Sequence, residues 1–374
     1  MPPKKSKKTV RSSLQKTSQK RKYIEDEIKE SSPTPKLSSA AANLRRSSCI
    51  SSQSSNFTEA LCDLEALELV ESKTNHFDLS SSASKFYPDN LKLLKITFVG
   101  ASAEKDVIPE VPVVQIQATF QKLDKYLLLT IDSETLGNHK FNVTTHTDIT
   151  SKKVQTFIMK LHDVIINGAQ QTGTDETFTD TLIDDLLHKY NDRFYYAFLK
   201  SRNNPISKIY IKGDGIITSD PKFVIQEKGK LFLLVVEDKH LKNVTSATGY
   251  GESQIAAEML ACGSENLRYL GKDTYTDQTI LAIRIISTYV TFYKTVIKAE
   301  YWKELDSGLP KEEEVEIQRW PAKNGLRAGF NFAEPIDRQT VFEALAKIRE
   351  SLLIKSNDEV QTEAVTAGGS GSNK

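Results

Sequence analysis

Six consecutive apolar residues, Leu231–Val236, stand directly before the polar run Glu237-Asp238-Lys239-His240. An uninterrupted apolar run of this length, bounded by turn residues, is typical of a strand buried on both faces of a sheet. Because side chains alternate along a strand, Glu237 and Lys239 are expected on one face and Asp238 on the other. An acid beside an amine at the end of a core strand is costly without a partner. The segment therefore predicts a central sheet with a site at its edge.

Metal-assisted hydrolysis of a phosphodiester is the chemistry that fits this pair. A divalent cation such as Mg²⁺ or Mn²⁺ prefers carboxylate oxygens at an open site, which Glu237 supplies. A neighbouring amine such as Lys239 can orient the attacking water, assist its deprotonation or stabilise charge that develops on the phosphate. Such a site needs a second carboxylate from a neighbouring strand.

Asp220 is the preferred second carboxylate. It opens a short segment that the turn Glu227–Lys230 joins, as a hairpin, to the strand ending at Glu237. Counting along that hairpin brings Asp220 near the level of Glu237. Asp214 is the alternative, and it can instead belong to the turn Gly213–Gly215.

The elements around this segment predict a mixed α/β layout, with a central sheet flanked by helices. Their order along the chain is helix, three strands, helix and strand. Helices are predicted at about 177–199, 253–262 and 338–353, and strands at 208–217, 223–226, 231–236, 279–286 and 289–297. On the second helix Gln254 and Glu258 share a face, and Glu252 and Glu258 are interpreted as exposed acids. The aromatic and basic strand 289–297 is interpreted as a core strand, with base stacking as the alternative.

Asp220, then Glu237-Asp238-Lys239 after an apolar strand, then a helix containing Gln254 together resemble the PD-(D/E)XK, or restriction-endonuclease-like, nuclease superfamily. The resemblance covers about residues 175–355. It implies that Glu237 and Lys239 are the acid and lysine of the motif and that Asp220 is the preceding aspartate. Gln254 matches the glutamine that many members carry on the next helix.

Members of this superfamily also often place an acid on the first core helix, which implies Asp184 as a further metal ligand beside Asp220 and Glu237. The competing acids on that helix are Glu176, Asp180 and Asp185.

The wider strings Val-Val-Glu-Asp-Lys-His-Leu and Tyr-Gly-Glu-Ser-Gln-Ile-Ala-Ala-Glu-Met-Leu-Ala-Cys look like the nuclease-type C-terminal domains of Crinkler-like proteins. The expected function is hydrolysis of DNA or RNA with Mg²⁺ or Mn²⁺. The alternatives are a catalytically inactive nuclease-like domain that binds nucleic acid or a protein, and an interaction protein in which the Glu237–Lys239 pair is structural.

The N-terminal sequence predicts a disordered basic tail over residues 1–56. This stretch is rich in Ser and Lys and nearly free of aromatic residues, so it buries too little apolar surface to offset the entropy of ordering. Residues 1–22 contain nine Lys and Arg and no acid. The pair Lys7-Lys8 and the cluster Lys20–Lys22 resemble a two-part nuclear import signal, which an import receptor would read. The expected location is nuclear or cytoplasmic.

A small α+β module is predicted for residues 57–167, and we find no catalytic constellation in it. Its expected elements are helices at 57–72 and 152–166 and strands at 91–99, 111–120, 126–131 and 140–144. Residues 356–374 are polar and are expected to form a disordered tail.

Composition narrows the class of protein further. The three cysteines, Cys49, Cys62 and Cys262, are too few and too scattered for a disulfide framework or a zinc site. No apolar run reaches the roughly 20 residues that span a bilayer. A soluble intracellular protein is expected, and the sequence leaves its oligomeric state open.

Overall fold

The computed structural model describes residues 78–127, 129–170, 175–189, 199–203, 206–227, 230–238, 244–271 and 274–368. The chain divides into two compact units, Met1–Leu61 and Cys62–Lys374, and every described residue belongs to the second. The predicted tail 1–56 and the predicted helix 57–72 lie outside the described residues.

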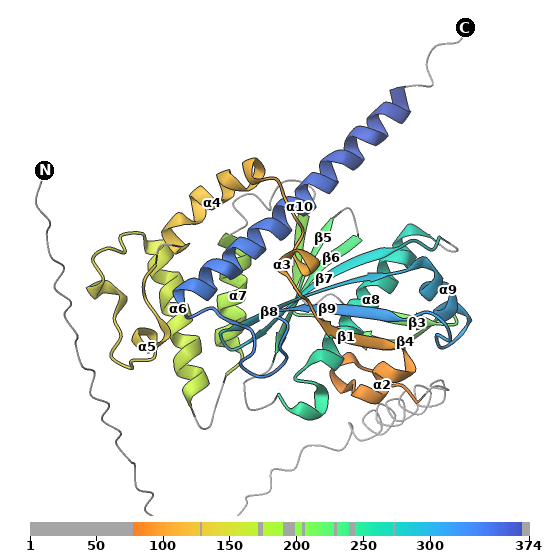
Figure 1. Ribbon diagram of the computed structural model, residues 1–374, viewed down its shortest axis with the longest axis horizontal. Helices are drawn as coiled ribbons and strands as arrows, with labels where there is room; N and C mark the ends of the chain where they lie inside the picture. Colours follow the sequence, from red (N-terminus) through yellow and green to blue (C-terminus); the bar gives the residue numbers. More distant parts are fainter. Residues whose placement is uncertain are drawn as a thin grey trace, which may run out of the picture. The chain divides into compact units, whose positions relative to one another are not determined.

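A mixed sheet forms the centre of the described residues (Figure 1). Its strands, in spatial order, are β1 (Ile96–Gly100), β9 (Val315–Trp320), β8 (Tyr289–Ile297), β7 (Gln278–Ile286), β6 (Lys230–Asp238), β5 (Phe223–Glu227) and β2 (Leu199–Asn203). A short strand, β10 (Phe330–Asn331), also pairs with β8. The pairs β1–β9 and β6–β7 are parallel and the others are antiparallel. The predicted mixed α/β sheet flanked by helices is confirmed.

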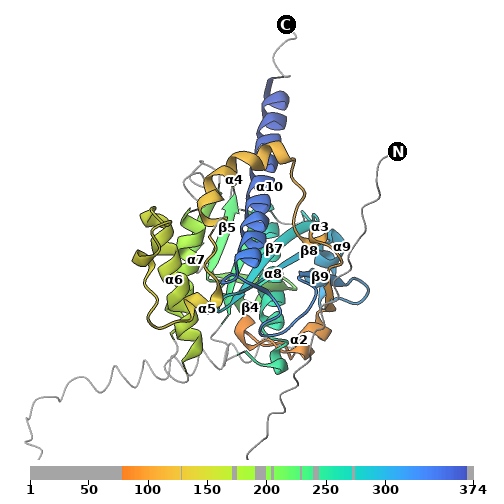
Figure 2. The same ribbon diagram turned by 60° about the vertical axis from the view of Figure 1, so that its left-hand side comes forward.

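Helices cover both faces of this sheet (Figure 2). One face carries α8 (Glu252–Leu270), α9 (Ala299–Ser307), α2 (Pro88–Leu93), the turn η1 (Ala83–Lys85) and a separate hairpin of β3 (Ser207–Ile211) and β4 (Asp214–Ser219). The other face carries α3 (Glu104–Val107), α4 (Val113–Leu127), α5 (Ser133–Leu136), α6 (Lys152–Ala169), α7 (Thr177–Lys189) and α10 (Pro335–Gly368). Side-chain alternation on β7 produces the two cores: Leu281 and Ile283 enter the second, while Ile280 and Ala282 enter the first.

The two halves of the chain share one sheet and one core. β1 pairs in parallel with β9, with Ile96 opposite Val315. In the core, the ring centroid of Phe157 on α6 lies 5.6 Å from those of both Tyr126 and Phe332 and 5.8 Å from that of Phe342. The described parts of 57–167 and 175–355, which the sequence predicted as a separate module and domain, therefore contribute to one sheet and one core.

Three predicted strands in this region are not strands. Residues 111–120 and the start of 126–131 belong to α4 and the residues flanking it, and the end of 140–144 is the 3₁₀ turn η2 (Val143–Thr145). The β-branched residues at 113 and 114 favoured a strand, yet Ile116, Phe120 and Leu123 recur at helical spacing and face the core.

Two further predictions need correction. The predicted strand 208–217 is the hairpin β3–β4, because Lys212 and Gly213 both adopt positive φ values, 55° and 80°, in a tight turn. The predicted tail after residue 356 is occupied as far as Gly368 by α10. The predicted helix 152–166 and the predicted strands 223–226, 231–236, 279–286 and 289–297 are confirmed within a few residues at each end.

The shared aromatic core generates a stability prediction. Phe157→Ala should lower the free energy of unfolding by about 3–5 kcal/mol, because it removes a fully buried ring that touches three others. Phe178→Ala, which removes a ring 40% exposed on α7, should cost about 1 kcal/mol or less. Urea unfolding followed by circular dichroism measures both. Two separate transitions, with only one shifted by Phe157→Ala, would contradict a shared core.

Candidate active site at the end of strand β6

The end of β6 meets the start of β5 and the end of β7 at one edge of the sheet. Glu237 pairs with Ile285, so its backbone position is fixed by the parallel register with β7. On the other side Phe223 of β5 pairs with Val235. Asp220 stands three residues before Phe223 and is exposed at this same edge. The register places the backbone of Glu237 at the end of β6, and the pairing of Asp220 with that level stays a prediction. The side chain of Glu237, and all of Lys239 and His240, lie outside the described residues.

Asp214, the alternative to Asp220, lies elsewhere. It is the first residue of β4 and follows the two-residue turn of the β3–β4 hairpin, whereas Asp220 follows the last residue of the same strand. A strand of six residues separates the two carboxylates by roughly 20 Å. Asp214 therefore lies next to the turn of this hairpin, and Asp220 lies between the end of β4 and the start of β5.

The acids of α7 lie beside the start of β5. Asp180 Oδ2 forms an ion pair with Lys222 Nζ at 2.8 Å, and Lys222 is two residues after Asp220. Asp184 is half-buried and stands one helical turn from Asp180, on the same face. Asp185 instead pairs with Lys160 on α6 at 3.3 Å. The acids of α7 thus lie on two faces of the helix. Asp180 and Asp184 lie on the face toward the start of β5, and Asp185 lies on the face toward α6.

On α8, Gln254 is half-buried and donates from Nε2 to Glu258 Oε1 at 2.8 Å, which fixes the orientation of its amide. The interpretation of Glu252 and Glu258 as exposed acids was wrong, because they are only 6% and 2% exposed. The reason is that α8 contacts the sheet through β6 and β7 and also the hairpin strand β3, so more than one of its faces is covered.

Sequence reasoning missed a buried arginine next to the site. Arg284 on β7 is 1% exposed and pairs in register with Val236, the residue before Glu237. Its Nη1 donates to the carbonyl of Tyr250 and, at 3.2 Å, to Oδ1 of Asn324. The available signal was a single Arg within an otherwise apolar strand, which marks a buried charge with fixed partners.

A second missed cluster surrounds Glu252 at the start of α8. Arg319 Nη1 on β9 forms an ion pair with Glu252 Oε1, and the hydroxyl of Tyr293 donates to the same oxygen at 3.4 Å. Burial raises the pKa of Glu252, and the positive charges of Arg319 and Arg284 offset part of that rise. The cluster ties α8 to β8 and β9 at the edge where β6 ends.

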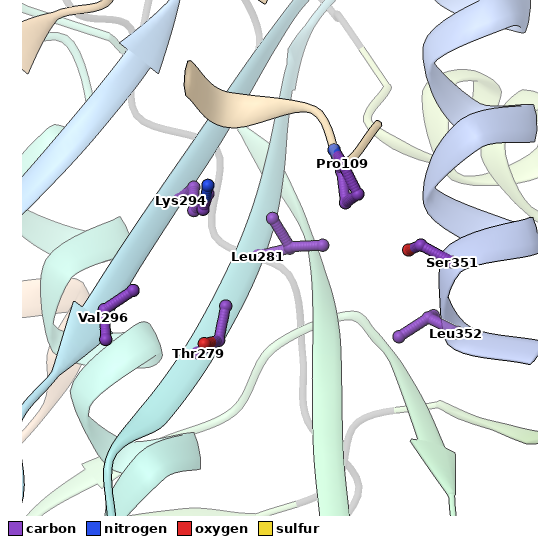
Figure 3. Close-up of a pocket in the computed structure, with 7 residues that line it drawn as sticks. All are labelled: Pro109, Thr279, Leu281, Lys294, Val296, Ser351 and Leu352. Carbon is purple, nitrogen blue, oxygen red and sulfur yellow. The ribbon is translucent and has the colours of Figure 1, made fainter. Parts of the chain in front are cut away.

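The aromatic strand β8 belongs to the core. Phe292 and Tyr293 are buried, and Lys294 Nζ donates to the carbonyl of Asp106 at 3.0 Å. A cavity of about 330 Å³ is lined by residues that include Lys294, Leu281 of β7 and Leu352 of α10. Figure 3 shows these side chains. Since Leu281 pairs with Leu233, near the start of β6, this cavity lies away from the edge that carries Glu237.

Among the described residues, no three His, Cys, Asp or Glu side chains come close enough together to hold a metal ion. That statement does not cover the expected ligand Glu237, because its side chain lies outside the described residues. In the same part of the chain, no helix is long and apolar enough to cross a membrane. No protein-family model matches the chain, and a search of curated proteins finds no match either.

The raised pKa of Glu252 generates a pH prediction. Unfolded chains release this proton in the ordinary glutamate range, roughly pH 4, whereas the folded protein releases it at a higher pH. The contribution that protonated Glu252 makes to the free energy of unfolding is therefore lost as the pH rises through the pKa of Glu252 in the folded protein. From about pH 4 to pH 7, wild type should lose stability relative to Glu252→Gln. Urea unfolding at a series of pH values measures the difference, and a difference that stays constant or changes in the opposite direction would contradict it.

Proposed function

We propose that the chain is a metal-dependent nuclease that hydrolyses phosphodiester bonds in DNA or RNA. The observation that carries the proposal is the pairing of the start of β5, three residues after the exposed Asp220, with the last part of the strand that carries Glu237. The PD-(D/E)XK resemblance requires a carboxylate before the strand and a Glu-x-Lys motif at its end, which Asp220, Glu237 and Lys239 supply in the sequence.

The order of elements supports a restriction-endonuclease-like domain. Helix α7 is followed by β2, β5 and β6, then by helix α8, and then by β7 parallel to β6. The order expected for residues 175–355 was helix, three strands, helix and strand, with the strands at 208–217, 223–226 and 231–236. Strands β5 and β6 match two of these, 208–217 is the hairpin β3–β4, and β2 is a further strand that the sequence did not predict. The inserted hairpin packs with α8 on one face and leaves the β5–β6 pairing intact.

The donor set fits a hard divalent cation. Asp220 and Glu237 are proposed to hold Mg²⁺ or Mn²⁺, with Asp184 as a further carboxylate, because oxygen ligands are what these ions select. When bound, such an ion polarises the phosphate and lowers the pKa of a water molecule. Asp220 is exposed and so is accessible to an ion and to a phosphodiester.

Two further side chains complete the proposed site. Lys239 positions the attacking water and stabilises negative charge on the phosphate. Gln254, whose amide is oriented by Glu258, is proposed to contact the substrate from the neighbouring helix. The hydrogen bond from Gln254 to Glu258 leaves the amide oxygen of Gln254 available as an acceptor.

Cleavage of labelled single- and double-stranded DNA and RNA with Mg²⁺ or Mn²⁺ tests the proposal. Asp220→Asn, Glu237→Gln and Lys239→Ala should each reduce the cleavage rate by about 100-fold or more, and a double variant should lose little beyond that, because the three act as one unit. Asp214→Asn should cut like wild type, since Asp214 lies at the far end of β4.

Two results would contradict the proposal. One is a wild-type protein that cuts none of these substrates, and the other is a Lys239→Ala variant that cuts as fast as wild type. Binding without cleavage would leave the inactive nuclease-like binding domain as the better description.

A further inference from the structure

The connection between β9 and β10, Pro321–Gly329, carries two exposed positive charges; we call it the basic loop. It contains Lys323 and Arg327 and no acidic residue. Both side chains are exposed, and neither forms an ion pair with any residue in the described part of the chain. The loop starts where β9 ends, and β1, β7 and β6 run in the same direction as β9, so they end on the same side of the sheet.

Both ends of the basic loop are fixed by close packing against glycine. A Cβ atom on Gly100, the last residue of β1, would lie 2.8 Å from the carbonyl oxygen of Ala322. At the other end, a Cβ on Gly329 would lie 2.6 Å from the carbonyl oxygen of Val290 on β8. Only glycine permits these two approaches, so the loop rests on the sheet at both of its ends.

Polar contacts fix the middle of the basic loop and connect it to the proposed site. Asn324 accepts from Arg284 Nη1 at 3.2 Å and donates from Nδ2 to the carbonyl of Gly249 at 2.9 Å. Arg319 donates from Nη2 to the carbonyl of Ala322 at 2.7 Å. The backbone of Arg284 pairs in register with Val236, the residue before Glu237. The side chain of Arg284 therefore connects the loop, through Asn324, to the strand next to the end of β6.

We propose that Lys323 and Arg327 bind the phosphodiester backbone of the nucleic acid that occupies the site at the end of β6. This inference rests on the proposed function, which supplies the substrate class. The residues that fix the loop are engaged with one another, whereas Lys323 and Arg327 are exposed to solvent. Cations on a backbone that is already ordered lose less entropy when they contact phosphate, and such contacts set the register of a nucleic acid without reading its sequence.

The test is binding of fluorescently labelled single- and double-stranded oligonucleotides to the full chain in EDTA, followed by anisotropy at several salt concentrations. The double variant Lys323→Ala/Arg327→Ala should bind about 10-fold more weakly at low salt. Its plot of log K against log salt should be shallower by about two, because two phosphate contacts are lost. The N-terminal cations are present in every protein compared, so the difference reports the loop alone.

Lys311→Ala is the matched control. Lys311 is an exposed lysine in the connection that precedes β9, at the opposite end of the strand that leads into the basic loop. It should bind like wild type. Equal affinity and slope for the double variant and wild type would overturn the inference, as would an equal loss in Lys311→Ala.

The outcomes separate this inference from the proposed function. Loop-dependent binding by a protein that cuts nothing would support the inference and refute the catalytic proposal. Cleavage by a protein whose binding is unaffected by the loop substitutions would overturn the inference and leave catalysis standing. A wild-type protein that binds no oligonucleotide in EDTA would overturn the inference, and the cleavage assay with Mg²⁺ or Mn²⁺ would still decide the catalytic proposal.

Discussion

The parallel pairing of β1 with β9 is the constraint on which the rest of the described structure depends. Parallel strands pair only when the chain between them returns to the same end of the sheet. Here the returning segment contains β5, β6, β7 and β8. These strands continue the sheet from β9, and β1 pairs with the other side of β9. The same closure brings α4 and α6, from before the proposed site, against α10, from after it. β6 thus lies inside the sheet, between β7 and β5. The position of its C-terminal end, at one edge of the sheet, depends on contacts between segments that are far apart in the sequence.

Charge is concentrated at that edge despite the cost of burying it. An isolated buried ion is strongly unfavourable, and ion pairs in a protein interior recover that cost only with good additional hydrogen bonds. Arg284 is surrounded by the carbonyl of Tyr250, the amide of Asn324 and the hydroxyl of Thr291, and Glu252 by Arg319 and the hydroxyl of Tyr293. These contacts join β7, β8, β9, the start of α8 and the basic loop. A rigid edge of this kind suits a site whose ligands come from separate strands.

The local sequence pattern predicted the helices and strands that have a clear hydrophobic periodicity. It did not predict features that depend on contacts between residues far apart in the sequence. The apolar run before Glu237 predicted β6, and the preference for Asp220 over Asp214 agrees with the position of Asp214 at the start of β4. Helix α4 was missed because β-branched residues outweighed its helical spacing. The pairing of β1 with β9 has no local signal, since register between remote segments depends on the whole sheet. Glu252 looked exposed because its partner Arg319 is remote in sequence, and only the fold shows that α8 is covered on several sides.

Mn²⁺ binding, followed by electron paramagnetic resonance of the full chain, tests most directly whether Asp220 and Glu237 form a metal site. Wild type should bind the ion, and Glu237→Gln and Asp220→Asn should each weaken binding by about 10-fold or more, because each removes a charged oxygen ligand. Asp214→Asn, which alters a carboxylate at the far end of β4, should bind like wild type. Equal Mn²⁺ affinity in wild type and Glu237→Gln would contradict a metal site at the end of β6.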